Sequence, residues 1–304
     1  MPGFSSMDDM ISKISAGQVL TIPWNKITGA AAYTAGRWYD SFTLTGSPPA
    51  GAFSGTALTT YTLSDASTGG ILHGGNKTPN LKYLLNIEAL VSAATGVPSY
   101  LLLVDYLAYY PGINMNVGGA SPANDQTMLS SNAGVNILPN RQGVQHTGAN
   151  CMMFLEALST TGASAHNINI TYTNSAGTSG KNLSTTLAAT ASAIVPHILH
   201  SGISTNNYGP FMPLAAGDLG VRSVQTLNLS AASGSASTAA LVLCEPLAKL
   251  PLGTTSIASA RDFLFNIPSL PQVKDGACLG FLIYSGAAMA AYTNWFAMLD
   301  VAWG

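Results

Sequence analysis

The sequence predicts a mainly β protein: two tandem, internally duplicated antiparallel β-sandwich units of jelly-roll type, preceded by a short helical arm. Three observations predict this class. Short apolar runs rich in strand-forming residues are separated by Gly/Ser/Asn/Thr turns, one motif is written twice far apart in the chain, and only one helical pattern is persuasive. The 304 residues are enough for two units that each bury a core.

The first element is an N-terminal arm, residues 1–20, with a helix in "SSMDDMISKISAG". Ser6 is the expected N-cap, Asp8 and Asp9 lie in the first turn, and Gly17 is the expected stop. The apolar stripe of this helix consists of Met7, Met10, Ile11 and Ile14. A helix this short is not stable alone, so we predict that the stripe docks on a partner.

The duplicated motif is Ile-Leu-His-x-Gly, which contains His73 in the first copy and His200 in the second. In both copies an alternating strand, an Ala-Ala-x-Gly turn and a second apolar strand follow, and the second strand carries an acidic residue, Asp105 or Glu245, ahead of a proline. This shared order indicates one structural unit written twice.

A second block recurs three times, with an Ile/Leu-Pro step, an apolar run and a closing glycine. Its prolines are Pro23, Pro139 and Pro268. Together the two kinds of block alternate along the chain and predict two units, residues 21–135 and residues 136–304, the second including the closing C-terminal strands. Units of this length suit an antiparallel β-sandwich.

Local patterns place further elements. Strands are expected at 167–174, 224–232, 240–247 and 295–303. A second helix is expected at 256–267, and the segment 79–94 fits either a helix or a strand.

Two interpretations fit the repeated histidines. His73 and His200 could be equivalent bases or ligands of two active sites, or rings that cap a turn that is itself repeated. No nucleophile or further ligand lies near either one in the sequence. His197 and His200 have the spacing of some metal pairs, but an extended segment points them to opposite faces and Pro196 disfavours a helix. We therefore predict no catalytic, cofactor-binding or metal-binding residue and a non-enzymatic protein.

Carboxylates and aromatic residues give no stronger signal. Asp105, Glu245 and Asp300 have no acidic neighbour in sequence, although a glycosidase-type pair is assembled in three dimensions. Aromatic clusters lie at 36–42 and 292–304, among others, and are expected to anchor a core or an interface. They would form a sugar-binding platform only if exposed.

Composition limits the classes of partner that the chain can bind. Only 8% of residues are charged and the net charge is −2, without a basic cluster, so we predict no binding to nucleic acid. Apolar runs are too short to span a membrane. The three cysteines lie in apolar runs and are expected to be free thiols of a protein assembled in a reducing cytoplasm. So few charges favour a protein covered by its neighbours.

Several stretches resemble poorly characterised virion proteins of tailed bacteriophages: "GFSSMDD", "TAGRWYD", "NNYGPF", "IPSLPQVKDGACL" and "DVAWG". The resemblance runs along nearly the whole chain, and its motifs are structural. It implies a structural component of a phage particle, present in many copies, and brings no functional residues with it.

The expected function is therefore that of a capsid decoration or cement protein, which binds and stabilises the assembled phage shell. The expected partners are the major capsid protein or other virion proteins, the expected form is a homo-oligomer with a trimer favoured, and the expected location is the virion, after assembly in the host cytoplasm. The alternatives are a tail, neck or fibre-like receptor-binding component and, from another class, a carbohydrate-binding β-sandwich module or glycan hydrolase.

Overall fold

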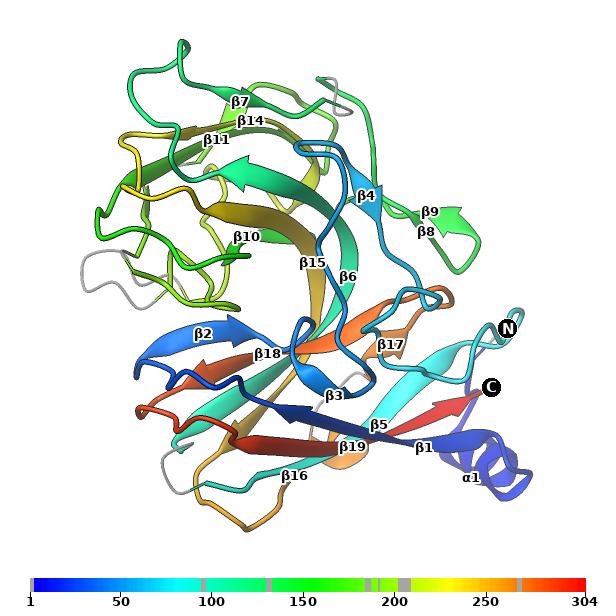
Figure 1. Ribbon diagram of the computed structural model, residues 1–304. Coiled ribbons are helices and arrows are strands. Elements are labelled where there is room, and N and C mark those ends of the chain that lie inside the picture. The colour runs from blue at the N-terminus through cyan, green and yellow to red at the C-terminus, as the bar shows by residue number, and fades with distance from the viewer. Residues whose placement is uncertain are drawn as a thin grey trace.

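The computed structural model describes residues 3–93, 97–129, 133–183, 187–190, 192–201, 209–266 and 270–304. Within these ranges strands predominate, and the helices are α1 (Met7–Ser15) and α2 (Phe263–Asn266). The strands form three antiparallel sheets, which we call the lower, central and upper sheets after their positions in Figure 1. The prediction of a mainly β chain is confirmed.

The lower sheet has the strand order β16 (Ser259–Asp262), β5 (Lys82–Val91), β19 (Asn294–Trp303), β1 (Val19–Ile27) and β3 (Thr45–Ser47), and β17 (Gln272–Val273) also pairs with β5. Residues along β19 alternate between buried and more exposed. Trp295, Ala297 and Leu299 are buried, whereas Phe296 and Met298 face solvent. This period of two is the pattern that predicted a strand at 295–303.

The central sheet has the order β10 (Met152–Ala157), β15 (Thr238–Leu252), β6 (Ser99–Asn114), β18 (Leu279–Ser285) and β2 (Arg37–Asp40), and β4 (Tyr61–Thr62) also pairs with β6. β6 and β15 are 16 and 15 residues long and pair along their whole length, with Asp105 opposite Glu245. Three register shifts interrupt this pairing. Such bulges bend strands, so one strand pair packs against both other sheets.

The upper sheet has the order β12 (Lys181–Asn182), β11 (Asn167–Asn174), β14 (Val221–Leu229) and β7 (Gln126–Thr127), and β13 (Leu187–Ala188) also pairs with β11. A separate hairpin is formed by β8 (Asn140–Arg141) and β9 (Val144–Gln145). The strands β11 and β14 confirm those expected at 167–174 and 224–232.

A short segment, residues 196–199, lies between the two edges of the central sheet. On one side it pairs with β2: Ile198 donates to the carbonyl of Trp38 at 3.0 Å, and Asp40 donates to that of Pro196 at 3.0 Å. On the other side it pairs with β10, where Leu199 donates to the carbonyl of Leu155 at 2.8 Å. Backbone hydrogen bonds therefore run around a closed ring of strands.

Three buried clusters fill the spaces between these layers. The first lies between the lower and central sheets and includes Trp24, Phe281 and Trp295. The second lies between the central and upper sheets and includes Tyr110 and Tyr172. The third lies on the opposite face of the central sheet, inside the ring, and consists of Phe42, Phe53, Leu63, Val104, Tyr106, Tyr109, Phe154, Ile198, Ala240, Val242, Cys244, Cys278 and Leu282.

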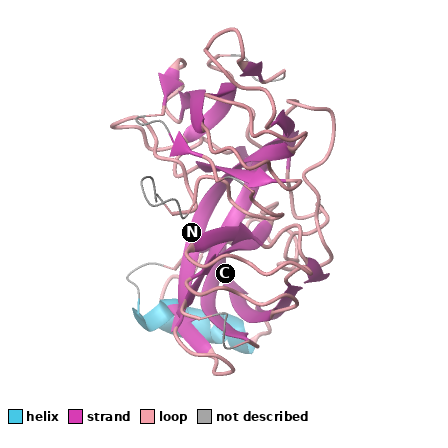
Figure 2. Ribbon diagram, turned by 60° about the vertical axis from the view of Figure 1, so that its left-hand side comes forward, coloured by secondary structure: helices cyan, strands magenta, loops and turns pink. Residues whose placement is uncertain are grey.

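The helical predictions have different outcomes. The N-terminal helix is confirmed: the Ser6 hydroxyl accepts from the amide of Asp9 at 3.1 Å, and Gly17 has a φ of 84° just past the end. Figure 2 shows helical ribbon at the lower end of the molecule.

The prediction of a helix at 256–267 is wrong for most of its length, since 259–262 is strand β16 and only 263–266 is helical. Pairing with β5 explains this, because a sheet edge overrides local helix propensity.

The ambiguous segment 79–94 forms strand β5 over its middle. The strands expected at 240–247 and 295–303 lie within β15 and β19. Units 21–135 and 136–304 contribute strands to the same central sheet, and their division stays a prediction. Pro268 of the thrice-repeated block lies outside the described residues.

Candidate functional site

The repeated histidines are both buried, and each hydrogen-bonds a backbone carbonyl. His73 Nε2 lies 2.9 Å from the oxygen of Ala277, and His200 Nε2 lies 3.0 Å from the oxygen of Pro210. Since a carbonyl only accepts, each ring carries its proton on Nε2. Burial lowers the pKa of both rings, that of His200 to about 4. Each neutral ring connects two segments of the chain through its hydrogen bond to a carbonyl. This use is of the kind that the turn-capping interpretation of the repeat expects.

His197, the other member of the candidate metal pair, is used differently. Its ring packs on Tyr39 with 5.4 Å between ring centroids, and burial lowers its pKa to about 3. The part of the chain that the structure describes holds no group of three or more His, Cys, Asp or Glu side chains arranged for a metal ion.

His73 belongs to a buried polar cluster. Lys82 Nζ lies 2.8 Å from His73 Nδ1, 2.5 Å from the oxygen of Gly75 and 3.0 Å from Asp275 Oδ1. These three acceptors match the three protons of an ammonium group. Asp275 in turn accepts from two backbone amides and a hydroxyl, those of Lys77 and Thr78. Burial raises the pKa of Asp275, but these donors outweigh it and the pKa is lowered.

A second polar cluster lies where β6 and β15 pair at Asp105 and Glu245. Arg141 reaches Asp105 through Nε and Nη2, at 2.6 and 2.8 Å. Glu245 accepts from His146 at 3.1 Å and from Lys274 at 2.9 Å. Burial raises the pKa of Asp105, whereas the two donors to Glu245 lower the pKa of that carboxyl despite its burial. These ion pairs attach the β8–β9 hairpin to the central sheet.

A third arrangement, a pair of carboxyls inside the ring, has no signal in the sequence. Asp40 on β2 and Glu156 on β10 are fully buried, and each carboxyl acts on the pKa of the other. Burial raises the pKa of both carboxyls. A glycosidase-type pair must contact a sugar and water. Neither solvent nor substrate reaches this pair, so it does not supply that chemistry. The residues lie on distant segments, and no local spacing could have signalled them.

The cysteines are free and buried, as predicted. Burial raises the pKa of the Cys151, Cys244 and Cys278 thiols well above the usual value. A thiol held in this protonated state is a poor nucleophile and a poor metal ligand.

The predicted contact stripe of α1 divides between the inside and the outside of the molecule. Met10 is buried and Ile14 is half-buried, whereas Met7 and Ile11 are 45% and 54% exposed. Met7 and Ile11 are therefore the part of the stripe that a partner can reach. Docking of this helix stays a prediction.

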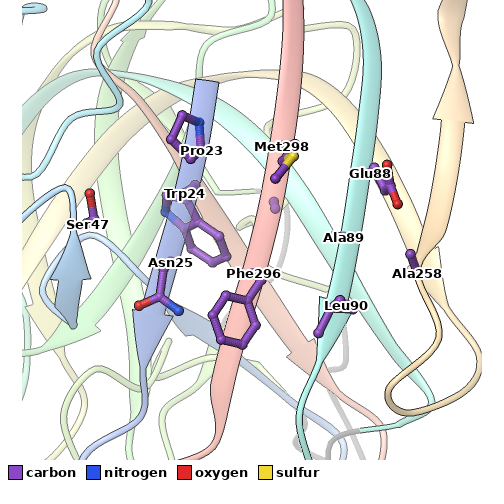
Figure 3. Close-up of a pocket in the computed structure, with 11 residues that line it drawn as sticks. Pro23, Trp24, Asn25, Ser47, Glu88, Ala89, Leu90, Ala258, Phe296 and Met298 are labelled. Atoms are coloured by element: carbon purple, nitrogen blue, oxygen red, sulfur yellow. The ribbon is translucent and has the colours of Figure 1, made fainter. Parts of the chain in front are cut away.

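The lower sheet carries a shallow apolar depression on its solvent face, which we call the sheet-face patch (Figure 3). Two cross-strand rows form it: Asn25, Phe296 and Leu90 in one, and Pro23, Met298 and Glu88 in the other. Phe296 and Met298 are 41% and 54% exposed. Glu88 is the one charged residue that lines it.

A row of aromatic side chains crosses the central sheet near its end. Trp38, Tyr284 and Tyr100 stand opposite one another on β2, β18 and β6, with ring centroids 5.4 and 6.1 Å apart. Tyr100 is 45% exposed, and the other two rings are half-buried. Adjacent rings are tilted by about 50° (48° and 52°), so they do not form one flat platform.

Comparison with known proteins finds no match, whether among family models, curated proteins or solved structures. Within the described ranges, neither helix has the length and apolar character needed to cross a membrane.

Proposed function

We propose that this chain is a non-enzymatic structural protein of a bacteriophage particle and that it decorates and stabilises the assembled shell. The observation that carries the proposal is the sheet-face patch, an uncovered apolar surface at the centre of a regular sheet. Monomeric proteins rarely leave such a surface open unless it binds something. The phage-like sequence stretches and the 8% charged residues support the same role.

Decoration acts through mass action. A protein that binds neighbouring shell subunits only when they are assembled stabilises the assembled state and leaves the separated subunits unaffected. The sheet-face patch provides apolar area for this contact, and Met7 and Ile11 on α1 provide a second contact. The partner is the major capsid protein or another virion protein.

The test replaces the two exposed side chains of the patch. Phe296→Ser with Met298→Ser is expected to leave the fold intact and to reduce occupancy on purified particles at least tenfold, measured by cryo-electron microscopy. Leu219→Ser is the control, because Leu219 is 74% exposed and lies outside the patch. Equal occupancy for the double variant and the control would contradict the proposal.

Deletion of residues 1–16 tests the helical contact separately. Attachment is expected to weaken while the sheets stay folded, because no residue of the stripe belongs to the three buried clusters. Unchanged occupancy of the deletion variant on particles would show that α1 is not part of the interface. Copy number distinguishes shell from tail: hundreds of copies per particle support decoration, and a few copies support the tail, neck or fibre-like alternative.

A second candidate function is glycan binding, favoured by the row of Trp38, Tyr284 and Tyr100. Aromatic rings near the end of a sheet can stack on sugars, although their tilt here disfavours a flat platform. Binding to a glycan array that is lost in Tyr100→Ala, with the patch variants unaffected, would favour this function over shell decoration.

We also infer that the arrangement of the long strands arose by duplication. Along the chain β5 and β6 are followed by β10 and β11, and the same order recurs as β14 and β15 followed by β18 and β19, so this division falls after β11 and not at residue 135. The last two strands of each half pair with the first two strands of the other half: β18 with β6, β19 with β5, β10 with β15 and β11 with β14. This reciprocal pairing supports a duplicated sandwich and a pseudo-twofold axis near Asp105 and Glu245.

In this arrangement a trimer of the chain would have six similar units around its axis. Mass measurement in solution tests the trimer. If the chain is a monomer at all concentrations, the trimer is contradicted. The contact with the shell is tested separately, by the occupancy of the patch variants on particles.

A further inference from the structure

The carboxyl pair inside the ring lies across the seam where the ring closes. Asp40 is the last residue of β2 and Glu156 lies near the end of β10. Between these strands lies the segment 196–199, whose Ile198 forms a β-bridge with Glu156 and packs inside the ring. The two carboxyls therefore approach each other across the segment that joins the two edges of the central sheet.

Each carboxyl has one oxygen that is satisfied by the protein and one that is not. Asp40 Oδ1 accepts from the Tyr106 hydroxyl and from the amide of Phe42 at 2.8 Å. Glu156 Oε1 accepts from the Thr43 hydroxyl at 3.1 Å. Asp40 Oδ2 and Glu156 Oε2 are buried, and no protein donor serves either of them. A proton held between the two carboxyls satisfies both oxygens at once, as a donor on one and an acceptor on the other.

We propose that the proton shared by Asp40 and Glu156 is a pH-sensitive latch that holds residues 196–199 between β2 and β10. With the proton present, the pair carries one negative charge and one hydrogen bond across the seam. Without it, two carboxylates face each other in a fully buried site. Like charges in a buried site, where solvent screens them little, repel each other strongly. The segment between them is then released and the ring opens at its seam.

Charged neighbours do not offset the second negative charge. Lys26 on β1 is the ammonium that acts on Asp40, but its Nζ donates to the carbonyls of Leu44 and Pro49, and burial lowers its pKa to about 8. It therefore loses its own charge as the pH rises through about 8. The other titratable groups that act on the pair are neutral acids on β6, on β15 and on the segments before β2 and β18: Tyr33, Tyr106, Cys244 and Cys278. On the seam segment itself, His197 packs on Tyr39 on the other face.

The direction of the effect follows from linkage. Burial raises the pKa of Glu156 in the folded protein above that in the unfolded chain. Such a group contributes stability that is fully present below the unfolded pKa and is lost as the pH rises through the folded pKa. The latch is therefore closed at low pH, weakens above the ordinary carboxyl pKa, and is open once the pH has risen through the raised pKa of the pair.

Hydrogen exchange across a pH series tests the latch. The reporters are the amides of Asp40, Ala157, Ile198 and Leu199, which all bond across the seam, and the reference is the amide of Thr28 in the lower sheet. After correction for intrinsic exchange, protection at the seam is expected to fall by about tenfold per pH unit between the ordinary carboxyl pKa of the open seam and the raised pKa of the closed pair. Protection at Thr28 is expected to stay constant over the first units of that fall.

Glu156→Gln removes the titration and keeps a hydrogen bond, because its amide donates to Asp40. Seam protection in this variant is expected to be independent of pH. Glu88→Gln is the matched control, since Glu88 is exposed on the lower sheet, and it should behave as the natural chain does. A seam that loses protection equally in Glu156→Gln and in the natural chain would overturn the proposal.

The natural chain provides a test that needs no variant. Carbon-13 NMR of the side-chain carboxyls across a pH series is expected to show a proton still held between Asp40 and Glu156 after the exposed carboxyls have ionised. If both carboxyls ionise together with the exposed ones, the latch is overturned, whether or not Glu156→Gln folds. None of these results bears on the sheet-face patch, so the proposed function stands or falls separately.

Discussion

At the residue scale, buried charges in this chain are held by several partners at once. Arg141 illustrates this: besides its two bonds to Asp105, its Nη2 lies 3.1 and 3.0 Å from the carbonyls of Leu63 and Tyr106. One guanidinium therefore links the β8–β9 hairpin, β6 and the segment after β4. Such a group fixes geometry, and its loss leaves an unpaired buried charge.

Arg141→Met is therefore expected to lower the free energy of unfolding by about 3–5 kcal/mol, because the Asp105 carboxylate stays buried without its partner. Urea unfolding at pH 7 measures this loss. Lys181→Met is the control: its ion pair with Asp218 spans 3.7 Å and its side chain is 34% exposed, so a loss below about 1 kcal/mol is expected. Equal losses in the two variants would show that Arg141 acts only as a surface residue.

Buried histidines give a second residue-scale prediction, for acid. Burial lowers the pKa of His197 to about 3 and of His200 to about 4, both below the unfolded value near 6.5. Neutral rings contribute stability that is present above pH 6.5 and is lost as the pH falls towards 4. His197→Phe keeps the packing on Tyr39 and removes one titrating ring. Its unfolding free energy is expected to fall less steeply between pH 6.5 and 4, by about 1.4 kcal/mol per pH unit at most. Identical slopes in urea titrations would refute this.

At the scale of single elements, the sequence predicted those strands and the helix whose patterns are local. The strand at 167–174 and the capped helix α1 show this, because alternation and capping residues lie within a few positions. The region 256–267 was predicted as a helix because its pairing with β5 is not a local property. For the same reason the Asp40–Glu156 pair was not predicted: only the ring closure brings these carboxyls together.

Strand β18 gives the prediction at this scale, because it passes directly beside a buried ring. A β-carbon on Gly280 would lie 2.6 Å from Tyr106 Cε2, inside the ring of strands. Gly280→Ala is therefore expected to cost about 1–3 kcal/mol through overpacking. Gly253→Ala is the matched control, since nothing lies within 4 Å of its added β-carbon. Comparison of the two melting temperatures decides the point, and a stabilised Gly280→Ala would mean that Tyr106 has room to move.

At the scale of the whole molecule, the long strands β6 and β15 make one fold out of both predicted units. β6 comes from residues 21–135 and β15 from residues 136–304, yet they pair from end to end. The lower sheet likewise combines β1 and β5 with β19, and the upper sheet combines β7 with β14. Each of the three buried clusters therefore draws side chains from both sides of residue 135.

This interleaving predicts that the two units do not fold separately, even if they arose by duplication. Fragment 1–135 lacks β15 and β18, so β6 would keep only the two-residue strand β4 as a partner, and fragment 136–304 lacks β6 itself. Each fragment alone is expected to give an unfolded spectrum by NMR, and the two expressed together are expected to reconstitute the sheets. The intact chain should then unfold in one transition, seen alike by tryptophan fluorescence and circular dichroism. Independent folding of fragment 136–304 would show that β15 pairs with another strand in the absence of β6. Strand pairing between the two units would then be excluded as the basis of stability.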